Sequence, residues 1–251
     1  MKNNPLHNQT KVTSIAVSLV WMAPFFIMLT LVVACSKISD QVFDQRINEG
    51  VIEYEITFPE SRDESITAGL LPDKMTYAFK ETGFASNFQT AGGVFKNNIV
   101  ADVTTKSLEH QLKVFRKKIK VKMNEDDILK MLAEYPRMTV IHTNDVDTIA
   151  GIACKKALIV FEEVDMKEIE VFYTDKIKMK TPNWCTQYHD IDGVLMAYEV
   201  EEFGIRMRLR ATSVQSRKIN QEDFDLKEDY TSISKEMMDV ELAQLVETFE
   251  L

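Results

Sequence analysis

The sequence is poor in glycine and cysteine, and it lacks the short motifs that mark common catalytic sites. Eight glycines in 251 residues argue against a glycine-rich repeat array or a phosphate-binding loop. Three cysteines are too few for a disulfide scaffold or a cysteine-rich zinc module. No Gly-x-Ser-x-Gly, His-Glu-x-x-His, Walker or Cys-x-x-Cys pattern occurs. We therefore expect a non-catalytic protein without a cofactor or a metal site.

Acidic residues are missing from the first 35 positions and outnumber basic residues afterwards. All 39 Asp and Glu follow residue 35, together with 28 of the 30 Lys and Arg, so residues 36–251 carry a net charge of −11. A domain this acidic is a poor nucleic-acid binder, because neutralising phosphates needs a basic face.

The N-terminus contains an uncharged run typical of an export signal. Lys2 and Lys11 precede residues 12–33, which carry no charge, and the small residue Ala34 follows. A basic start, an apolar centre and a small-residue end indicate a signal peptide over residues 1–34. The run is also long enough to span a membrane, so an uncleaved anchor is the competing interpretation.

Cys35 favours cleavage and lipidation. The segment 32–35 (VVAC) resembles the lipobox of bacterial lipoproteins, whose cysteine is acylated and becomes the first residue of the mature chain. This resemblance implies a lipid anchor at Cys35 and a polar tether over residues 35–49. Ser36 follows the cysteine in place of Asp, which implies the outer membrane of a Gram-negative bacterium. Which side of that membrane the protein faces stays open.

Alternating apolar and polar residues dominate from Gly50 onward. Ile52, Tyr54 and Ile56 share one face, for example, while Glu53 and Glu55 share the other. Similar runs lie at 75–80, 84–88, 99–103, 108–123 (one bent strand or two), 138–142, 152–161, 169–173, 177–179, 194–200 and 205–211. About ten strands predict a large antiparallel sheet in a single domain over residues 50–251, of the mainly β, α+β class.

The runs at 194–201 and 205–214 form the clearest predicted hairpin. One register places opposite charges together and apolar side chains together. The expected pairs are Glu201–Arg206, Val200–Met207, Glu199–Arg208 and Tyr198–Leu209. The three arginines at 206, 208 and 210 are then a solvated face matched by acidic residues, with an anion site as the less favoured interpretation.

Two amphipathic helices are expected. Asn124 is a suitable N-cap for residues 125–135, which begin with three acidic residues and stop at Pro136. Residues 234–249 carry an apolar stripe of Met238, Leu242, Leu245 and Phe249. Such helices can cover the open face of a sheet.

The segment 184–190 (WCTQYHD) is the most site-like stretch, because it gathers aromatic, His and Asp side chains in a loop. The alternative is a turn whose aromatic residues fill the domain interior, and it is favoured because no nucleophile lies at a fixed spacing. His110 and His142 lie in apolar strands, so we interpret both as structural.

Cys154 and Cys185 are the two thiols that follow Cys35. In an oxidising envelope they could form a disulfide, which would stabilise the domain by roughly 3–4 kcal/mol. Two separate buried thiols are the equal alternative, because a bridge needs Cα atoms within roughly 7 Å.

Three segments carry a family resemblance: 69–75 (GLLPDKM), 149–157 (IAGIACKKA) and 191–199 (IDGVLMAYE). They resemble uncharacterised Gram-negative lipoproteins related to the LolA/LolB lipoprotein carriers. This resemblance implies an unclosed β-barrel, a strongly curved antiparallel sheet with two or more helices over its concave face. In the carriers that concavity binds acyl chains.

Strand parity then selects the inward side chains. Ile52, Ile56 and Met75 belong to this face, and seven others are the candidate cavity residues: Tyr54, Tyr77, Phe79, Met196, Tyr198, Met207 and Leu209. The first functional hypothesis is an envelope lipoprotein that binds a lipid or another apolar ligand there. An accessory subunit docking a membrane protein complex is the second, and an enzyme built around residues 184–190 is the weakest.

Overall fold

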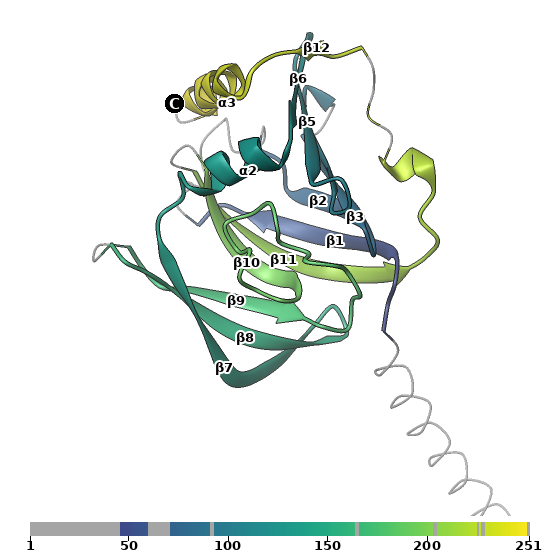
Figure 1. Cartoon of the computed structure of the whole chain (residues 1–251), viewed down its shortest axis with the longest axis vertical. Helices are drawn as coiled ribbons and strands as arrows, with labels where there is room; N and C mark the ends of the chain where they lie inside the picture. The colour runs from purple at the N-terminus through teal and green to yellow at the C-terminus, as the bar shows by residue number, and fades with distance from the viewer. Residues whose placement is uncertain are drawn as a thin grey trace, which may run out of the picture. The chain divides into compact units, whose positions relative to one another are not determined.

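The structure is a computed structural model that describes residues 46–59, 71–90, 93–163, 166–202, 205–224, 226 and 229–249. The chain divides into two units, Met1–Gln45 and Arg46–Leu251. The predicted signal peptide, Cys35 and most of the predicted tether therefore lie outside the described residues. The second unit carries the sheet and helices described below (Figure 1).

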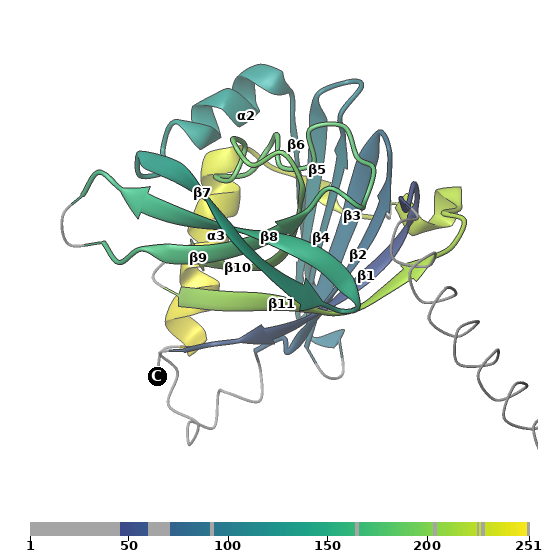
Figure 2. The same cartoon turned by 90° about the horizontal axis from the view of Figure 1, so that it is seen from below.

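Twelve strands of the described residues form one curved sheet that does not close, which confirms the predicted fold class (Figures 1 and 2). The strands are β1 (Gly50–Thr57), β2 (Lys74–Lys80), β3 (Gly83–Gln89), β4 (Phe95–Asp102), β5 (Ser107–Val114), β6 (Lys117–Met123), β7 (Met138–Ile149), β8 (Ile152–Phe161), β9 (Ile169–Thr174), β10 (Val194–Glu202), β11 (Ile205–Ser216) and β12 (Thr231–Ser232). Their order is β12-β6-β5-β4-β3-β2-β1-β11-β10-β9-β8-β7, and the short β12 pairs parallel to β6.

The β10–β11 hairpin has the predicted register, with all four expected pairs in place. Two arginines of its outer face pair across the hairpin: Arg206 lies 3.3 Å from Glu201, and Arg208 lies 2.6 Å from Glu199. The third, Arg210, pairs instead with Asp147 of β7, at 3.4 Å. The arginine face is therefore matched by acidic residues.

Two other strand predictions are resolved by the structure. The run at 108–123 is two strands, β5 and β6, joined by a tight turn in which Phe115 has a φ of 51°. The predicted strand at 177–179 is wrong, because Ile177 forms only an isolated parallel bridge with Ile47. That bridge attaches the end of the predicted tether to the sheet unit: the Ile47 amide donates to Lys176 O at 2.8 Å.

Two helices lie on the concave side of the sheet (Figure 2). Helix α2 (Glu125–Leu132) begins with a reciprocal capping box between Asn124 and Asp127, as its sequence predicts. It ends at Leu132, earlier than expected, and Leu129 of its predicted apolar face is 58% exposed. Helix α3 (Lys235–Phe249) directs Met238 into the core beside β6. A short 3₁₀ turn, η3 (Gln221–Phe224), precedes β12.

The interior holds three apolar clusters. One lies on β1, β2, β10 and β11 and includes Ile52, Phe79 and Met196. A second joins β3–β6 to the two helices through Ile128 and Met238. A third packs β8, β9 and β10 against the loop between β9 and β10. No helix of the described residues is long and apolar enough to cross a membrane.

Candidate functional site

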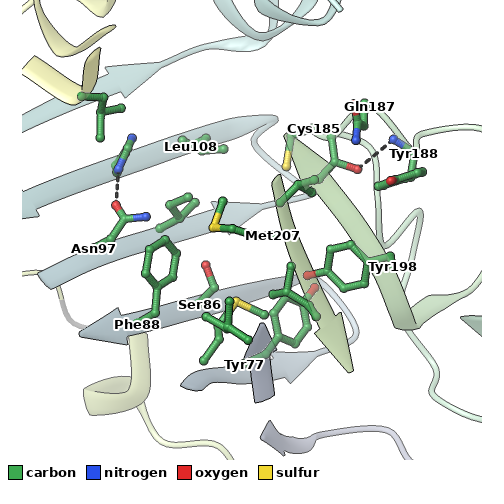
Figure 3. A pocket seen from close by; sticks show the side chains of 18 of the residues that line it. Tyr77, Ser86, Phe88, Asn97, Leu108, Cys185, Gln187, Tyr188, Tyr198 and Met207 are labelled. Carbon is green, nitrogen blue, oxygen red and sulfur yellow. Dashed lines mark hydrogen bonds between the residues drawn. The ribbon is translucent and has the colours of Figure 1, made fainter. Parts of the chain in front are cut away.

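A cavity of about 560 Å³ lies between the concave face of the sheet, the two helices and the loop that precedes β10 (Figure 3). Its walls are mainly apolar and aromatic. They include side chains from β1–β6, β10 and β11, from α2 and α3, and from residues 182–188. A large apolar cavity with a few polar groups is the usual form of a small-molecule site.

The floor of the cavity follows from strand register. One row of directly opposed residues runs across β2 to β6: Tyr77, Ser86, Ile99, His110 and Val121. All five line the cavity. Ser86 is the smallest member of the row and lies between Tyr77 and Ile99. Its short side chain leaves cavity space above this part of the floor (Figure 3).

The structure places five of the seven candidate residues in the cavity wall: Tyr54, Tyr77, Tyr198, Met207 and Leu209. Phe79 and Met196 do not line it, and both are 0% exposed. Phe79 shares the parity of Tyr77, but its ring packs on β1 at Gly50. A Cβ atom added to Gly50 would lie 3.2 Å from Phe79 Cζ. Met196 lies where the β9–β10 ladder shifts register. The alternation along each strand therefore predicted which side chains face inward. It did not predict how far the cavity extends along each strand.

The tyrosines of the cavity form an edge-to-face network. The Tyr54 ring lies 6.3 Å from that of Tyr77 and 6.0 Å from that of Tyr198. The Tyr54 hydroxyl donates to Leu195 O at 2.6 Å, at the shifted part of the β9–β10 ladder. Burial raises the pKa of Tyr54 and Tyr198 well above ordinary values, so both stay neutral.

A neutral polar pair lines one part of the cavity. His110 Nε2 hydrogen-bonds Asn97 Oδ1, from adjacent strands β5 and β4. Burial lowers the pKa of His110 to about 4, while the charge of Asp239 opposes this shift. The imidazole is therefore neutral at pH 7. Sequence alone predicts a structural role for His110 and does not single out Asn97. One sequence signal could have identified His110 as an inward-facing residue: it has the same parity on its strand as Leu108 and Leu112.

Charged side chains from α3 and from the segment that follows α2 also line the cavity. Lys235, at the start of α3, lies 2.7 Å from Asp239 and 3.5 Å from Glu134. All three line the cavity. Burial lowers the pKa of Lys235, but the hydrogen bonds and charges of the two carboxylates outweigh it and raise the pKa above its usual value. The ammonium is therefore fixed in its charged form between two acids.

Cys185 and Tyr188 of the loop segment 184–190 are buried in the interior, while His189 and Asp190 are exposed. Tyr188 is 1% exposed, and its hydroxyl donates to Glu199 O. His189 is exposed; its Nδ1 lies 3.3 Å from Thr186 O and its Nε2 lies 3.7 Å from Asp190 Oδ1. These contacts assemble no nucleophile with a base.

Cys154 and Cys185 are free, buried thiols. They belong to different apolar clusters, and the structure has no bridge between them. Burial raises the pKa of Cys154 to about 11 and that of Cys185 to about 12, so neither is a reactive thiolate at pH 7. No three His, Cys, Asp or Glu side chains in the described part of the chain are grouped to hold a metal ion.

Comparison with known proteins gives only distant structural likeness. No protein-family model matches the chain. No curated protein matches it either. A β-barrel-like protein of the domain of unknown function DUF1849 from Brucella abortus is similar at 9% identity, with a TM-score of 0.36, over 69% of this chain and 100% of that one. MucB is similar at 10% identity, with a TM-score of 0.37, over 74% of this chain and 60% of that one. Values this low transfer no function.

Proposed function

We propose that this chain is a non-catalytic protein that binds an apolar ligand, the acyl chain of a lipid, in the cavity between its curved sheet and its helices. The observation that carries the proposal is the cavity itself: about 560 Å³, with mainly apolar and aromatic walls. Natural ligand pockets span about 300–1,000 Å³.

The energetics of such a site are sufficient for binding. Each methylene moved from water into the cavity contributes about 0.8 kcal/mol, so ten methylenes give about 8 kcal/mol before the costs of association. The tyrosine network and the packed floor are held by the protein's own contacts, so less ordering is needed when a ligand enters.

The ionisation states of the cavity residues favour binding over catalysis. His110 is neutral and a weak base, the buried tyrosines keep their protons, and the Cys185 thiol is protonated at pH 7. General acid–base or nucleophilic chemistry requires groups that titrate or ionise near the working pH. The pKa values of these groups lie outside that range.

The compartment is part of the proposal and rests on the sequence. We propose that residues 1–34 are cleaved and that Cys35 anchors the chain to the outer membrane of a Gram-negative bacterium. Replacing Cys35 by Ala is expected to leave an uncleaved precursor that no longer incorporates labelled fatty acid. Unchanged processing and labelling of Cys35→Ala would refute the anchor without affecting the cavity.

Ligand binding is tested with a neutral fluorescent probe, N-phenyl-1-naphthylamine, and the chain from Ser36 to Leu251. This chain lacks the apolar run of residues 12–33, which would itself bind the probe, and it retains the whole unit that begins at Arg46. One saturable site is expected. Ser86→Trp is expected to abolish that site, because the new indole would occupy the centre of the cavity floor.

The matched control is Gln89→Trp, which lies on the same strand at an exposed position of the opposite parity. It should bind the probe like the wild type. If the wild-type chain shows no saturable binding, or if both Trp variants bind equally well, the cavity is not the binding site and the proposal fails.

A further inference from the structure

We propose that the cavity selects acyl chains carried in an ester or amide linkage with a neutral or cationic head, and that it discriminates against free fatty acids. This inference rests on the proposed function and adds the chemical class of the ligand. It follows from the charges and hydrogen-bond donors that the cavity offers to a polar head.

The charge balance of the cavity wall is unfavourable for a carboxylate. Among the residues that the structure describes, three charged side chains line the cavity: Glu134, Lys235 and Asp239. The single ammonium is already shared by both carboxylates, at 2.7 Å from Asp239 and 3.5 Å from Glu134. One negative charge is left in excess. A fatty-acid carboxylate would meet no unshared ammonium here and would be repelled by the excess negative charge, although solvent screens the charge of Glu134, which is 71% exposed.

The neutral polar pair offers what an ester or amide needs. Asn97 is only 6% exposed, and its Oδ1 is already hydrogen-bonded to His110. Its amide nitrogen is directed into the cavity (Figure 3). A neutral N–H donor suits a carbonyl oxygen, and it leaves no charge to compensate.

The two groups lie at the same end of the cavity. The Asp239 charge acts on His110, and Glu134 shares the Lys235 ammonium with Asp239, so both carboxylates belong to the part of the cavity that holds the Asn97–His110 pair. Phe88 lies opposite Asn97 in the β3–β4 ladder, and Tyr77 and Met207 belong to the same apolar wall (Figure 3). A ligand with its carbonyl at Asn97 would therefore extend its chain along these walls and hold its head beside Glu134 and Asp239. That head should be uncharged or cationic.

The test compares three twelve-carbon ligands for displacement of bound N-phenyl-1-naphthylamine at pH 8, below their critical micelle concentrations. The ligands are monolauroyl glycerol, a neutral ester; dodecylamine, a cation; and laurate, an anion. The ester and the amine are expected to displace the probe at concentrations about tenfold lower than laurate, which corresponds to the loss of one favourable polar contact.

Charge variants distinguish the effect of the carboxylates in the cavity wall from the effect of the protein's overall negative charge. In Glu134→Gln/Asp239→Asn, Lys235 becomes a free cation, and laurate is expected to gain about tenfold in apparent affinity while the ester changes less than about twofold. The control, Asp147→Asn/Asp175→Asn, makes the same charge change at exposed carboxylates whose partners, Arg210 and Lys155, lie outside the cavity wall. It should leave the order of the three ligands unchanged.

Each outcome is decisive. The predicted order in the wild type, together with its loss in the site variant alone, supports the inference. Equal or stronger displacement by laurate overturns it, as does an identical response of the two double variants, since the preference would then come from the overall acidity of the protein. If the probe does not bind at all, the proposed function fails. If the probe binds and the three ligands are equivalent, only this inference fails.

Discussion

The two halves of the curved sheet close their concave faces by different means. On β8, β9 and β10 the interior is filled by the loop that precedes β10, whose Tyr188 and Ile191 are almost fully buried. On β2–β6 the face is covered by two helices, of which Ile128 and Met238 are the fully buried side chains. The cavity lies mainly against the second half and reaches the first only through β10 and residues 182–188, while no residue of β8 or β9 lines it.

The comparison shows how a fold of this kind can combine stability with an open interior. A loop is continuous with its own strand, so it can insert side chains at chosen depths: Asn183 fixes the loop by donating to Ile191 O and Gly193 O, at 2.8 and 2.9 Å. A helix keeps a fixed radius and contacts a concave sheet along one stripe, which leaves room on either side of the contact.

The largest expected effect is the loss of packing in the half that the loop fills. Tyr188→Ala should lower the free energy of unfolding by about 4 kcal/mol, because a buried aromatic side chain and its hydrogen bond to Glu199 O are removed. Phe88→Ala in the cavity wall is the matched variant. It should cost less than half as much, because Phe88 is only partly buried, whereas Tyr188 is 1% exposed. Urea denaturation of both variants measures the difference, and equal costs would contradict the distinction between the halves.

The second effect is an acid-induced loss of stability from His110. Its pKa is about 4 in the folded protein and about 6.5 when unfolded, so the unfolded state binds more protons between these values. The free energy of unfolding should therefore fall as the pH drops from about 6.5 to about 4, by up to about 3 kcal/mol. His110→Gln should flatten this part of the pH profile. A variant that tracks the wild type across this range would show that the fold does not lower the pKa of His110.

A smaller effect is expected at the start of the covering helix. Asn124→Ala removes the capping box of α2 and should cost about 1 kcal/mol. Asp126→Ala, in the first turn but outside the capping box, is the comparison and should cost a few tenths of a kcal/mol. Thermal unfolding followed by circular dichroism distinguishes them. Equal shifts would show that the cap contributes nothing of its own.

The smallest effect is expected on the outer face. Arg208→Ala removes the ion pair with Glu199, but Arg208 is largely exposed, so the change should stay below about 1 kcal/mol and shrink further in high salt. A double-mutant cycle with Glu199→Gln isolates the pair. A coupling energy well above this range would mean that the convex face also stabilises the fold substantially.

The sequence alone predicted the structure correctly for two features that depend on local patterns. The β10–β11 register followed from alternating charges and apolar residues, and the cap of α2 followed from Asn124 and the acids after it. It was insufficient where distant segments meet. Ile177 has strand-like neighbours but finds only Ile47 as a partner, and the distribution of Cys154 and Cys185 over two clusters depends on the whole fold.

The site was predicted less completely for the same reason. Parity identified Tyr54 and Tyr198 as inward-facing, because it depends only on each strand. It could not separate Phe79 from Tyr77, since the difference is the position of the cavity along the strand. The polar end of the cavity requires residues of β4, β5, α2 and α3 to come together, and no spacing in the sequence records that.

The most direct test of the account is photolabelling with a glycerol ester of a twelve-carbon acyl chain that carries a diazirine near its end. The account predicts labels on cavity residues of β2–β6, such as Tyr77 and Phe88, that unlabelled monolauroyl glycerol competes away and that Ser86→Trp prevents. Labels within β8 and β9, or labels confined to exposed apolar side chains such as Val146 and insensitive to competition, would contradict it.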